Sequence, residues 1–383
     1  MIGSKRRKCL LKAKVSKIDI YAVDIPFKMK FGHAAKKRVS SESIFVRVET
    51  ECGKVGFGES LPRRYVTGED QSSVIDALKD ECRRAVLGRT FNSFSEAMDF
   101  GDSLGGLKGA ARCAIELALL DAAGKVFNCS VIDTFDKVPT NNLKYSAVIG
   151  SEAPFKAGLL ALASRLYGLK DIKVKVGDPY DIKRLEMVRR VAGGDADIRL
   201  DANCAWTAEE AIDILNNMRI FNFSVIEQPV KKSDIRALRK VSAAISEPVM
   251  ADESLCTIDD ANRLAEERAC KMFNIRISKC GGILNSLKIA RIAKSAGISC
   301  QLGCQVGESG VLSAAGRHFA SCVTGIRYLE GSYARFLLAE DMVKEDISFG
   351  YEGRARVLQG AGLGVTVNED VLNKYVKSKA TIQ

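Results

Sequence analysis

The sequence predicts an α/β protein built as a (β/α)8 barrel with an added α+β domain. From about residue 143, eight short apolar segments alternate with amphipathic helical segments. This pattern favours parallel strands with helices between them, and eight such units in about 200 residues match the size of a (β/α)8 barrel. Polar residues near the predicted strand ends recur every 25 to 27 residues, which is the length of one strand–helix unit.

The first domain is predicted over residues 1–140. Helical periodicity marks SSVIDALKDECRRAVLG, and GAARCAIELALLDAAGKVF (109–127), apolar nearly all round, should be a buried helix. PFKMKFGHAAKKRVSS is expected to be a long polar loop, and the first residues are expected to be a disordered basic tail. The strands are predicted in VSKIDIYAVDI, SIFVRVET and GKVGFGES, the last two joined by the hairpin signal ECGK.

The barrel is predicted over residues 141–345, and residues 346–383 are expected to return to the first domain. Within this last segment, GLGVTVNEDVL is interpreted as the returning strand. The eight barrel strands are predicted in KYSAVI, IKVKV, IRLDA, SVIEQ, PVMAD, MFNIRI, ISCQLG and IRYLE.

Composition and charge exclude several classes of protein. The chain is 46% hydrophobic and 27% charged, as is typical of globular proteins, and no apolar run approaches the roughly 20 residues of a membrane-spanning helix. The net charge of +11 comes from lysines and arginines spread along the chain, which favours an anionic small molecule over nucleic acid. The 12 cysteines include no C-x-x-C pair, and the apolar part of the N-terminus is too short for a secretory signal, so we expect reduced thiols in a cytoplasmic protein.

Three carboxylates lie at the ends of consecutive predicted strands: Asp201, Glu227 and Asp252. Neighbouring strands lie about 5 Å apart, so these side chains should converge at the C-terminal edge of the barrel, where active sites form. Three carboxylates cannot all stay ionised there without a counter-charge. Oxygen-only ligands predict Mg²⁺ in this role, with Mn²⁺ as an alternative.

Lysines from two opposite strands flank this predicted metal site. Lys173 and Lys175 alternate with apolar residues in IKVKV, so they should share one face of a strand. The charge of Lys173 should disfavour the protonated form of Lys175 and make it a better base. Lys279 follows the sixth strand, opposite the second strand in an eight-stranded barrel. One lysine on each side of a metal-bound carboxylate suits removal of the proton on the adjacent carbon, through an enediolate.

These residues resemble the enolase superfamily, and within it the muconate-lactonizing-enzyme subgroup. The resemblance covers nearly the whole chain and implies a modified barrel with an α+β capping domain, whose lid loops lie near residues 26–36 and 58–69. It also implies a small-molecule carboxylate substrate and frequent assembly into homo-oligomers. The motifs that carry it are KVK at 173–175, DAN at 201–203, EQP at 227–229, ADES at 251–254 and SKCGG at 278–282.

The resemblance assigns roles to single residues. Asn203 and Glu308, the latter in QVGESG, match supporting polar residues of related sites, and Ser146 matches a hydroxyl position on the first barrel strand. Arg64 and Tyr65 lie in the second lid loop, where cationic residues predict an anionic substrate. The implied Mg²⁺ ligands are Asp201, Glu227 and Asp252, and the implied acid/base residues are Lys175 and Lys279, with Lys173 beside them.

Several reactions share this skeleton, and the sequence separates some of them. Mandelate-racemase-like members use a histidine late in the barrel, a position that neither His33 nor His318 fits. Dipeptide epimerases usually carry Asp-x-Asp on the last strand to grip the substrate ammonium, whereas YLEGSYARFLL offers Glu330 alone. We expect a Mg²⁺-dependent racemase or epimerase of a dipeptide or N-acyl amino acid. A muconate-type cycloisomerase or an o-succinylbenzoate synthase-like dehydratase is the alternative.

Overall fold

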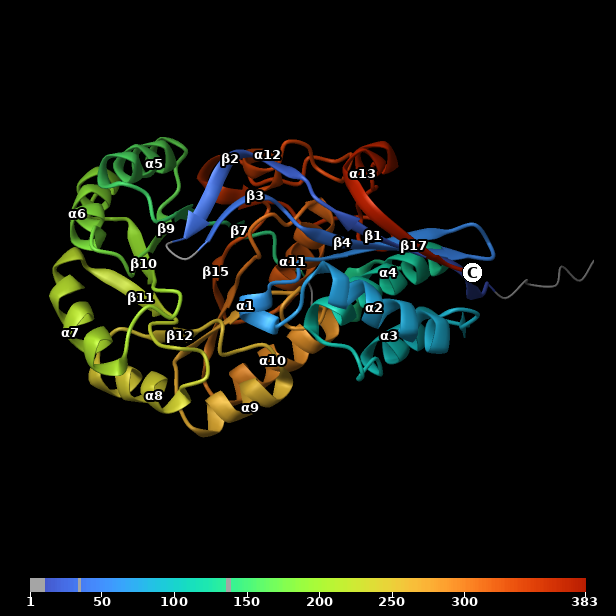
Figure 1. Cartoon of the computed structure of the whole chain (residues 1–383), viewed down its shortest axis with the longest axis horizontal. Coiled ribbons are helices and arrows are strands. Elements are labelled where there is room, and N and C mark those ends of the chain that lie inside the picture. Colours follow the sequence, from blue (N-terminus) through green and yellow to red (C-terminus); the bar gives the residue numbers. More distant parts are fainter. Residues whose placement is uncertain (1–10, 34–35, 136–138) are drawn as a thin grey trace, which may run out of the picture.

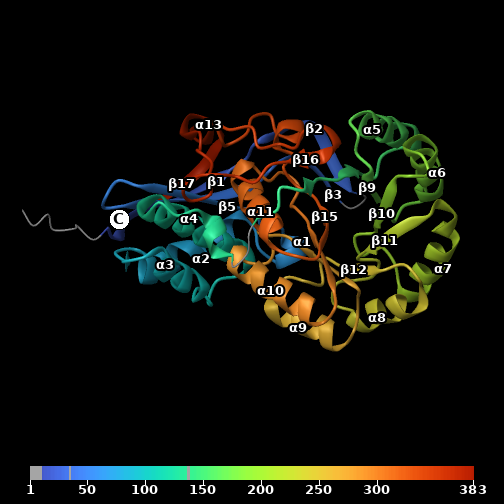
Figure 2. The ribbon, with the colours of Figure 1, turned by 180° about the vertical axis from the view of Figure 1, so that it is seen from behind.

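The computed structural model describes residues 11–33, 36–135 and 139–383, and the predicted basic tail at residues 1–10 lies outside the described residues. A barrel ringed by helices forms one side of the molecule, and a strand-rich capping domain packs against it (Figure 1). Seen from behind, the C-terminal strand β17 (Val376–Ile382) lies beside β1 (Ala13–Val23) in the capping domain (Figure 2). The predicted fold class is confirmed.

The capping sheet is antiparallel, with the strand order β17-β1-β4-β5. The turn between β4 (Ser43–Thr50) and β5 (Val55–Ser60) is the predicted hairpin, and Gly53 takes a φ of 78° there, a conformation that glycine adopts without strain. The short strand β6 (Thr90–Phe91) also pairs with β1.

Helix α4 (Gly109–Phe127) has the predicted bounds and is buried on nearly every side. It packs against β5 through small residues, because a Cβ at Gly58 would lie only 2.0 Å from the carbonyl oxygen of Ala114. The other helices of this domain are α1 (Arg64–Thr67), α2 (Gln71–Glu81) with a π-helical extension (Cys82–Val86), α3 (Phe94–Asp102) and the 3-10 helix η2 (Val131–Thr134).

Replacing Gly58 with alanine should destabilise the fold by about 3 kcal/mol, because the new methyl group meets backbone that cannot yield locally. The check is the shift of the urea-unfolding midpoint. Gly106→Ala is the matched control, since a Cβ at Gly106 would meet nothing within 4 Å. Equal shifts for both variants would contradict the close packing of β5 on α4.

Eight parallel strands form the barrel sheet, in the chain order β8 to β15. A parallel bridge between Tyr145 and Leu329 joins the two ends of this sheet. Every strand overlaps the segment predicted for it. The bounds are β8 (Ala147–Ile149), β9 (Asp171–Lys175), β10 (Asp197–Asp201), β11 (Phe223–Glu227), β12 (Val249–Ala251), β13 (Met272–Ile275), β14 (Ser299–Leu302) and β15 (Ile326–Leu329).

Helices follow the barrel strands and surround them (Figure 1). Several begin at strong caps: Thr207 and Thr257 each form a capping box, which satisfies backbone N–H groups of the first turn. The helices are α5 (Pro154–Leu166), α6 (Asp181–Ala192), α7 (Ala208–Met218), α8 (Ile235–Ala244), α9 (Ile258–Glu266), α10 (Ile283–Ser295) and α11 (Gly310–Cys322). The remaining elements are β7 (Leu143–Lys144), η3 (Arg219–Phe221), α12 (Ala334–Leu337), η4 (Tyr351–Gly353), β16 (Arg354–Ala355) and α13 (Glu369–Tyr375).

Two predicted segments differ from the structure. The long polar loop predicted for PFKMKFGHAAKKRVSS is wrong, because β2 (Pro26–His33) and β3 (Lys36–Ser40) pair as an antiparallel hairpin; a lid near residues 26–36 stays a prediction. The strand predicted in GLGVTVNEDVL is also wrong, because this segment leads into α13 and the returning strand is β17. Most of β17 is exposed, so it lacks the apolar alternation by which strands are recognised in a sequence.

Within the described part of the chain, no helix combines the length and the apolar character needed to cross a bilayer. The described cysteines all carry free thiols. Burial raises the pKa of Cys82, Cys270 and Cys300 to about 12, so these thiols stay protonated and unreactive at neutral pH.

Candidate active site

Three carboxylates meet at the C-terminal edge of the barrel sheet. Asp201 ends β10 and Glu227 ends β11, and the two residues are register partners. Asp252 directly follows β12. All three side chains are buried, so the folded chain brings together the carboxylates that the strand spacing singled out.

Two cations lie between these carboxylates. Lys173 Nζ is 3.5 Å from Asp201 Oδ2 and 3.4 Å from Glu227 Oε2, and Arg276 contacts both Glu227 and Asp252. In this arrangement the described residues include no three His, Cys, Asp or Glu side chains close enough to share a metal ion. The donor set still fits a hard divalent cation, because it consists of carboxylates and Asp201 Oδ2 is buried without a hydrogen bond. Binding such a cation would require Lys173 and Arg276 to give up these contacts.

The two lysines predicted as acid and base lie on opposite strands. Lys175 ends β9, the second strand of the barrel, and Lys279 follows β13, the sixth. Lys175 Nζ donates a hydrogen bond to Asn203 Oδ1 at 2.5 Å and lies 3.5 Å from Asp201 Oδ2. Lys279 Nζ donates to Asp252 Oδ1 at 2.8 Å. The two amines therefore approach the carboxylates from different sides.

Lys173 lies on the same strand face as Lys175. Its Nζ donates to Glu330 Oε2 at 2.7 Å, while Arg199 donates to Glu330 Oε1 at 3.2 Å. Burial disfavours the charged form of Lys173, but the carboxylates led by Glu227 outweigh burial and raise its pKa above the usual range. Lys173 stays protonated, and the carboxylates around it offset the repulsion that was predicted between the two lysines.

Lys173, Lys175 and Asp201 open into a cavity of about 250 Å³, which we call the catalytic cavity, whereas Glu227, Asp252 and Lys279 are absent from its described lining. Arg64 and Ser146 are absent from its described lining: the Arg64 side chain is 80% exposed and pairs with Asp70, and the buried Ser146 hydroxyl makes no hydrogen bond. Predicted site residues that do line it are Tyr65, Lys173, Lys175, Asp201, Asn203, Glu308 and Glu330.

The lining residue Glu308 is an acid poised to ionise near neutral pH. Burial raises its pKa to about 8, a hydrogen bond from the backbone N–H of Gln305 opposes this shift, and the nearby Glu59 carboxylate adds to it. Glu59 comes from β5, so the capping domain sets part of the electrostatics of the catalytic cavity.

Residues just beyond the strand ends take rare backbone conformations. Asn203, Cys204 and Gln228 have φ values of 44°, 66° and 38°, and such outliers concentrate at functional sites. The Gln228 side-chain oxygen accepts the backbone N–H groups of Asp252 and Ser254 at 2.9 and 3.1 Å. Gln228 thereby fixes the loop that presents Asp252.

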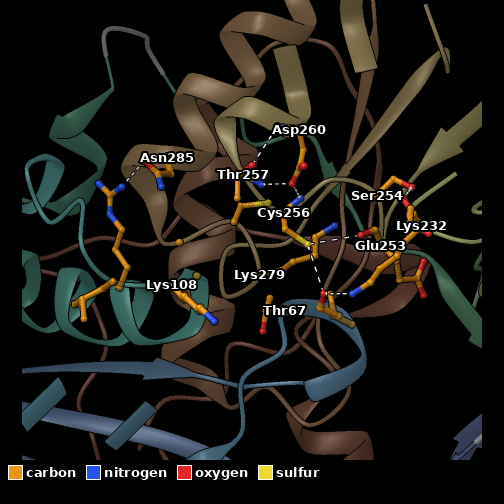
Figure 3. A pocket seen from close by; sticks show the side chains of 17 residues that line it. Thr67, Lys108, Lys232, Glu253, Ser254, Cys256, Thr257, Asp260, Lys279 and Asn285 are labelled. Carbon is orange, nitrogen blue, oxygen red and sulfur yellow. Dashed lines mark hydrogen bonds between the residues drawn. The ribbon is translucent and has the colours of Figure 1, made fainter. Parts of the chain in front are cut away.

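A second cavity, of about 530 Å³, lies beside Lys279 (Figure 3). Thr67 and Lys108 of the capping domain and loops of the barrel form its walls. Glu253 lines both cavities, whereas Lys175 lines only the catalytic cavity and Lys279 only the second one. Burial, together with the charge of neighbouring Asp252, raises the pKa of Glu253 to about 7.

Three buried residues that support the site escaped the sequence reasoning: Asn274, Arg276 and Arg199. Asn274 Nδ2 donates to Glu227 Oε1 at 2.7 Å, and Arg276 bridges two carboxylates. The alternation of side chains along a strand would have identified Asn274 and Arg276. Residues two apart on a strand share a face, and Ser278 of SKCGG continues the row that these two begin. Arg199 pairs with Lys173 in the register of β9 and β10.

Lysines and carboxylates that converge at the strand ends of a barrel are the arrangement expected of an enzyme that moves protons next to a carboxylate. The chain belongs to the mandelate racemase/muconate lactonizing enzyme family of the enolase superfamily, as the motifs predicted. Residues 15–135 match the mandelate racemase/muconate lactonizing enzyme N-terminal domain, and residues 158–371 match the enolase C-terminal domain-like family.

Similar proteins are epimerases and racemases. The chain is 29% identical over 355 residues to the hydrophobic dipeptide epimerase of Enterococcus faecalis, covering 92% of this chain and 99% of that one. It is 30% identical over 367 residues to the N-succinyl-L-Arg/Lys racemase of Bacillus cereus, covering 94% and 97%. This chain is an isomerase.

Solved structures give the same result. The B. cereus N-succinyl Arg/Lys racemase superposes with a TM-score of 0.90 at 28% identity, over 97% of this chain and 100% of that one. The E. faecalis dipeptide epimerase, solved with Mg and the dipeptide L-Leu-L-Tyr, superposes with a TM-score of 0.84 at 28% identity, over 92% of this chain and 99% of that one.

Proposed function

We propose that this isomerase is a Mg²⁺-dependent racemase or epimerase, with N-acyl amino acids as preferred substrates and dipeptides as the second candidate. The observation that carries this proposal is the placement of Lys175 and Lys279 on opposite strands of the barrel. Inversion of an α-carbon needs a proton to leave from one face and another to arrive on the opposite face, so it needs one acid/base group on each side.

Asp201, Glu227 and Asp252 would hold Mg²⁺, which when bound supplies positive charge to stabilise the enediolate form of the substrate carboxylate. Asn203 orients the Lys175 amine and Asp252 orients the Lys279 amine. The neutral amine of one lysine takes the α-proton, and the ammonium of the other delivers a proton to the opposite face. The protonated Lys173 adds a fixed positive charge beside the developing negative charge.

The preference for N-acyl substrates rests on the surroundings of Glu330. Both of its oxygens already accept hydrogen bonds, from Lys173 and from Arg199, and its exposed fraction is 2%. Two residues further on, Ser332 takes the place of a second carboxylate, and its Oγ accepts a hydrogen bond from Arg317. A substrate ammonium would have to displace buried ion pairs at this end of the cavity, whereas an uncharged acyl-amide would not.

The wall next to this end can receive an acyl chain. Leu160, Phe336 and Leu337 line it together with Val148, so an apolar acyl group would bury its surface there. Glu152 also lines the cavity, but its carboxylate already pairs with Lys156 at 2.9 Å, so an N-terminal ammonium in the same position would lose hydration or have to displace this pair.

N-acyl amino acids should therefore have kcat/KM values at least ~10-fold above those of dipeptides with the same carboxyl-terminal residue, a difference of about 1.4 kcal/mol. Glu330→Gln should lower activity on both substrate types alike, because Glu330 holds Lys173 rather than the substrate. Polarimetry on matched pairs of substrates measures both effects, with the exposed Glu186→Gln as the control variant.

Two results would contradict the preference. The first is a wild-type enzyme that favours free dipeptides. The second is a Glu330→Gln variant whose KM rises for dipeptides only, which would assign Glu330 to the substrate ammonium.

Muconate-type cycloisomerisation and o-succinylbenzoate synthase-like dehydration remain the alternatives. Muconate lactonizing enzyme of Pseudomonas fluorescens superposes with a TM-score of 0.85, but at 24% identity it shares the fold alone. Neither alternative inverts a stereocentre by two-sided proton transfer, so polarimetry on chiral N-acyl amino acids separates them from the proposed reaction.

A further inference from the structure

The second cavity lies at the junction of the capping domain and the barrel, and α1 separates it from the catalytic cavity. Tyr65 lines the catalytic cavity, whereas Val66 and Thr67 of the same helix line the second one. The volume of about 530 Å³ falls within the range of small-molecule binding sites. Lys279 is the one residue of the proposed mechanism in its described lining, and its ammonium donates to Asp252. Most of this cavity therefore has no role in the proposed reaction.

The described lining of the second cavity has a formal charge of +2. Four cationic side chains and two carboxylates contribute to it: Lys108, Arg112, Lys232, Lys279, Glu253 and Asp260. Among the described residues, the Lys108 ammonium has no ion-pair partner. Lys232 Nζ donates only to uncharged groups, the carbonyl oxygens of Tyr65 and Val66, at 3.0 and 2.7 Å. Lys108 lies on the capping side of the cavity and Lys232 on the barrel side (Figure 3), so an anion between them would meet uncompensated positive charge from both domains.

Three buried polar atoms of the lining have no hydrogen-bond partner among the described residues. Arg112 Nε and Thr67 Oγ1 are donors of this kind, and Glu253 Oε2 is an acceptor, although its other oxygen accepts from Asn203 at 3.2 Å. Buried polar groups are seldom left unpaired, because each costs free energy. The Asp260 carboxylate, in contrast, already caps the first turn of α9. A ligand with several acceptor oxygens and one hydroxyl donor would satisfy all three unpaired atoms.

We propose that the second cavity binds a small phosphate monoester that carries a hydroxyl group, and that this ligand braces α1. Its phosphate oxygens would accept hydrogen bonds from Arg112 and Thr67. Its charge of about −1.5 to −2 at neutral pH matches the lining, with Lys108 and Lys232 as the counter-charges. Its hydroxyl would donate to Glu253 Oε2.

The position of α1 connects this site to the catalytic cavity. The wall formed by α4 is fixed, because a Cβ at Gly109 would lie only 2.4 Å from the carbonyl oxygen of Lys279. The α1 wall is a single turn of helix, and Lys232 of the barrel holds two of its carbonyl oxygens. A ligand bound to both Lys232 and Thr67 would add a second link between the barrel and α1. Occupancy would therefore steady the helix that places Tyr65 in the catalytic cavity.

Isothermal titration calorimetry of the full chain tests the site, with glycerol 3-phosphate as the probe. The titration contains no substrate, so its outcome is separate from that of the proposed reaction. The wild type should bind the probe saturably. Ser233→Glu should weaken binding at least ~10-fold, because it places a carboxylate in the lining beside a dianion, and Ser233 is exposed, so the fold should be retained. Lys108→Gln should weaken binding too, whereas Lys231→Gln, at an exposed lysine outside both described linings, should bind as the wild type does.

Comparison of probes tests the ligand class. Inorganic phosphate should bind more weakly than glycerol 3-phosphate, because it lacks the hydroxyl-bearing carbon chain, and succinate should bind more weakly than both. Absence of saturable binding by glycerol 3-phosphate would overturn the proposal. Equal affinity of Ser233→Glu and wild type would place the probe elsewhere and overturn it as well. Tighter binding of succinate would overturn the assignment to phosphate esters.

Hydrogen exchange measures the effect of the ligand on α1. The amides of Thr67 and Gly68 donate to carbonyl oxygens one turn earlier, so their exchange rates report the opening of this helix. Glycerol 3-phosphate at about ten times its Kd should slow both about 10-fold, whereas the amide of Gly53 in the capping hairpin should exchange at an unchanged rate. Binding without slower exchange at Thr67 and Gly68 would overturn the link between the second cavity and α1.

Discussion

Alanine at Lys279 should lower the rate of stereochemical inversion at least ~10²-fold, while Lys175 still exchanges the α-proton of one stereoisomer with solvent. Alanine at Lys175 should give the mirror-image result, with exchange retained for the other stereoisomer. The reason is geometric, because β9 and β13 lie four strands apart in an eight-stranded barrel, so we expect each lysine to reach one face of the substrate. Proton NMR in D₂O with both stereoisomers of the best substrate measures exchange and inversion together.

Lys183→Ala is the control for this pair of variants. Lys183 is exposed on α6, away from the lining of the catalytic cavity, so its loss should leave both rates unchanged. One pattern would count against two-sided proton transfer: loss of exchange with both stereoisomers in one variant and near-normal exchange in the other. That pattern would favour a one-base cycloisomerase or dehydratase.

Removal of divalent metal should lower turnover by roughly 10³-fold, because charge stabilisation of an enediolate is worth several kcal/mol. Mg²⁺ should restore activity after chelation with EDTA, and Mn²⁺ should do so as the alternative. Asp201→Asn and Glu227→Gln should weaken the binding of Mg²⁺ in calorimetric titrations, because each variant removes one anionic donor. Asp346→Asn, at an exposed carboxylate paired with Arg335, is the control.

Unchanged turnover in protein shown by elemental analysis to be free of metal would contradict the assignment of the three carboxylates as Mg²⁺ ligands. Normal Mg²⁺ binding by both variants would have the same consequence. In that case the positive charge of Lys173 and Arg276, which contact these carboxylates in the structure, would be the remaining stabiliser of the intermediate.

Strong periodicity explains why the barrel was predictable from the sequence. Buried parallel strands are short apolar runs, and amphipathic helices separate them at a constant spacing. The final strand β17 gave no such signal, because it lies at the edge of the capping sheet and exposes residues such as Lys377 and Lys379. The hairpin of β2 and β3 was missed although Phe27, Met29 and Phe31 alternate with Lys28 and Lys30 in β2, because the polar and basic residues that follow suggested a loop.

The candidate site likewise contains residues that the sequence identified and residues that it did not. Asp201, Glu227 and Lys175 could be found from their own positions at strand ends, because the barrel alone decides where those side chains converge. Alternation places Arg276 on the face of the site, but the sequence did not show that Arg276 and Arg199 are buried as cations, because a buried cation is stable only through partners on other strands.

In the second predicted lid loop, the sequence did not show which arginine turns inward. Arg64 was predicted to contact substrate, but its neighbour Arg63 is the buried one and donates to the carbonyl oxygens of Ser41 and Val306 at 2.9 and 2.8 Å. The start of α1 decides which of two adjacent arginines turns inward, and no periodicity in the sequence records that choice.

The central claim is that this enzyme exchanges the proton next to a carboxylate, and wild-type exchange measures it most directly. Proton NMR would follow the α-proton signals of N-acyl amino acids, dipeptides and muconates in D₂O with Mg²⁺ present. We expect the α-proton signal of at least one N-acyl amino acid to disappear from both stereoisomers while the chemical structure stays intact. Persistence of every α-proton signal, with conversion of a muconate to its lactone instead, would contradict racemisation or epimerisation as the function.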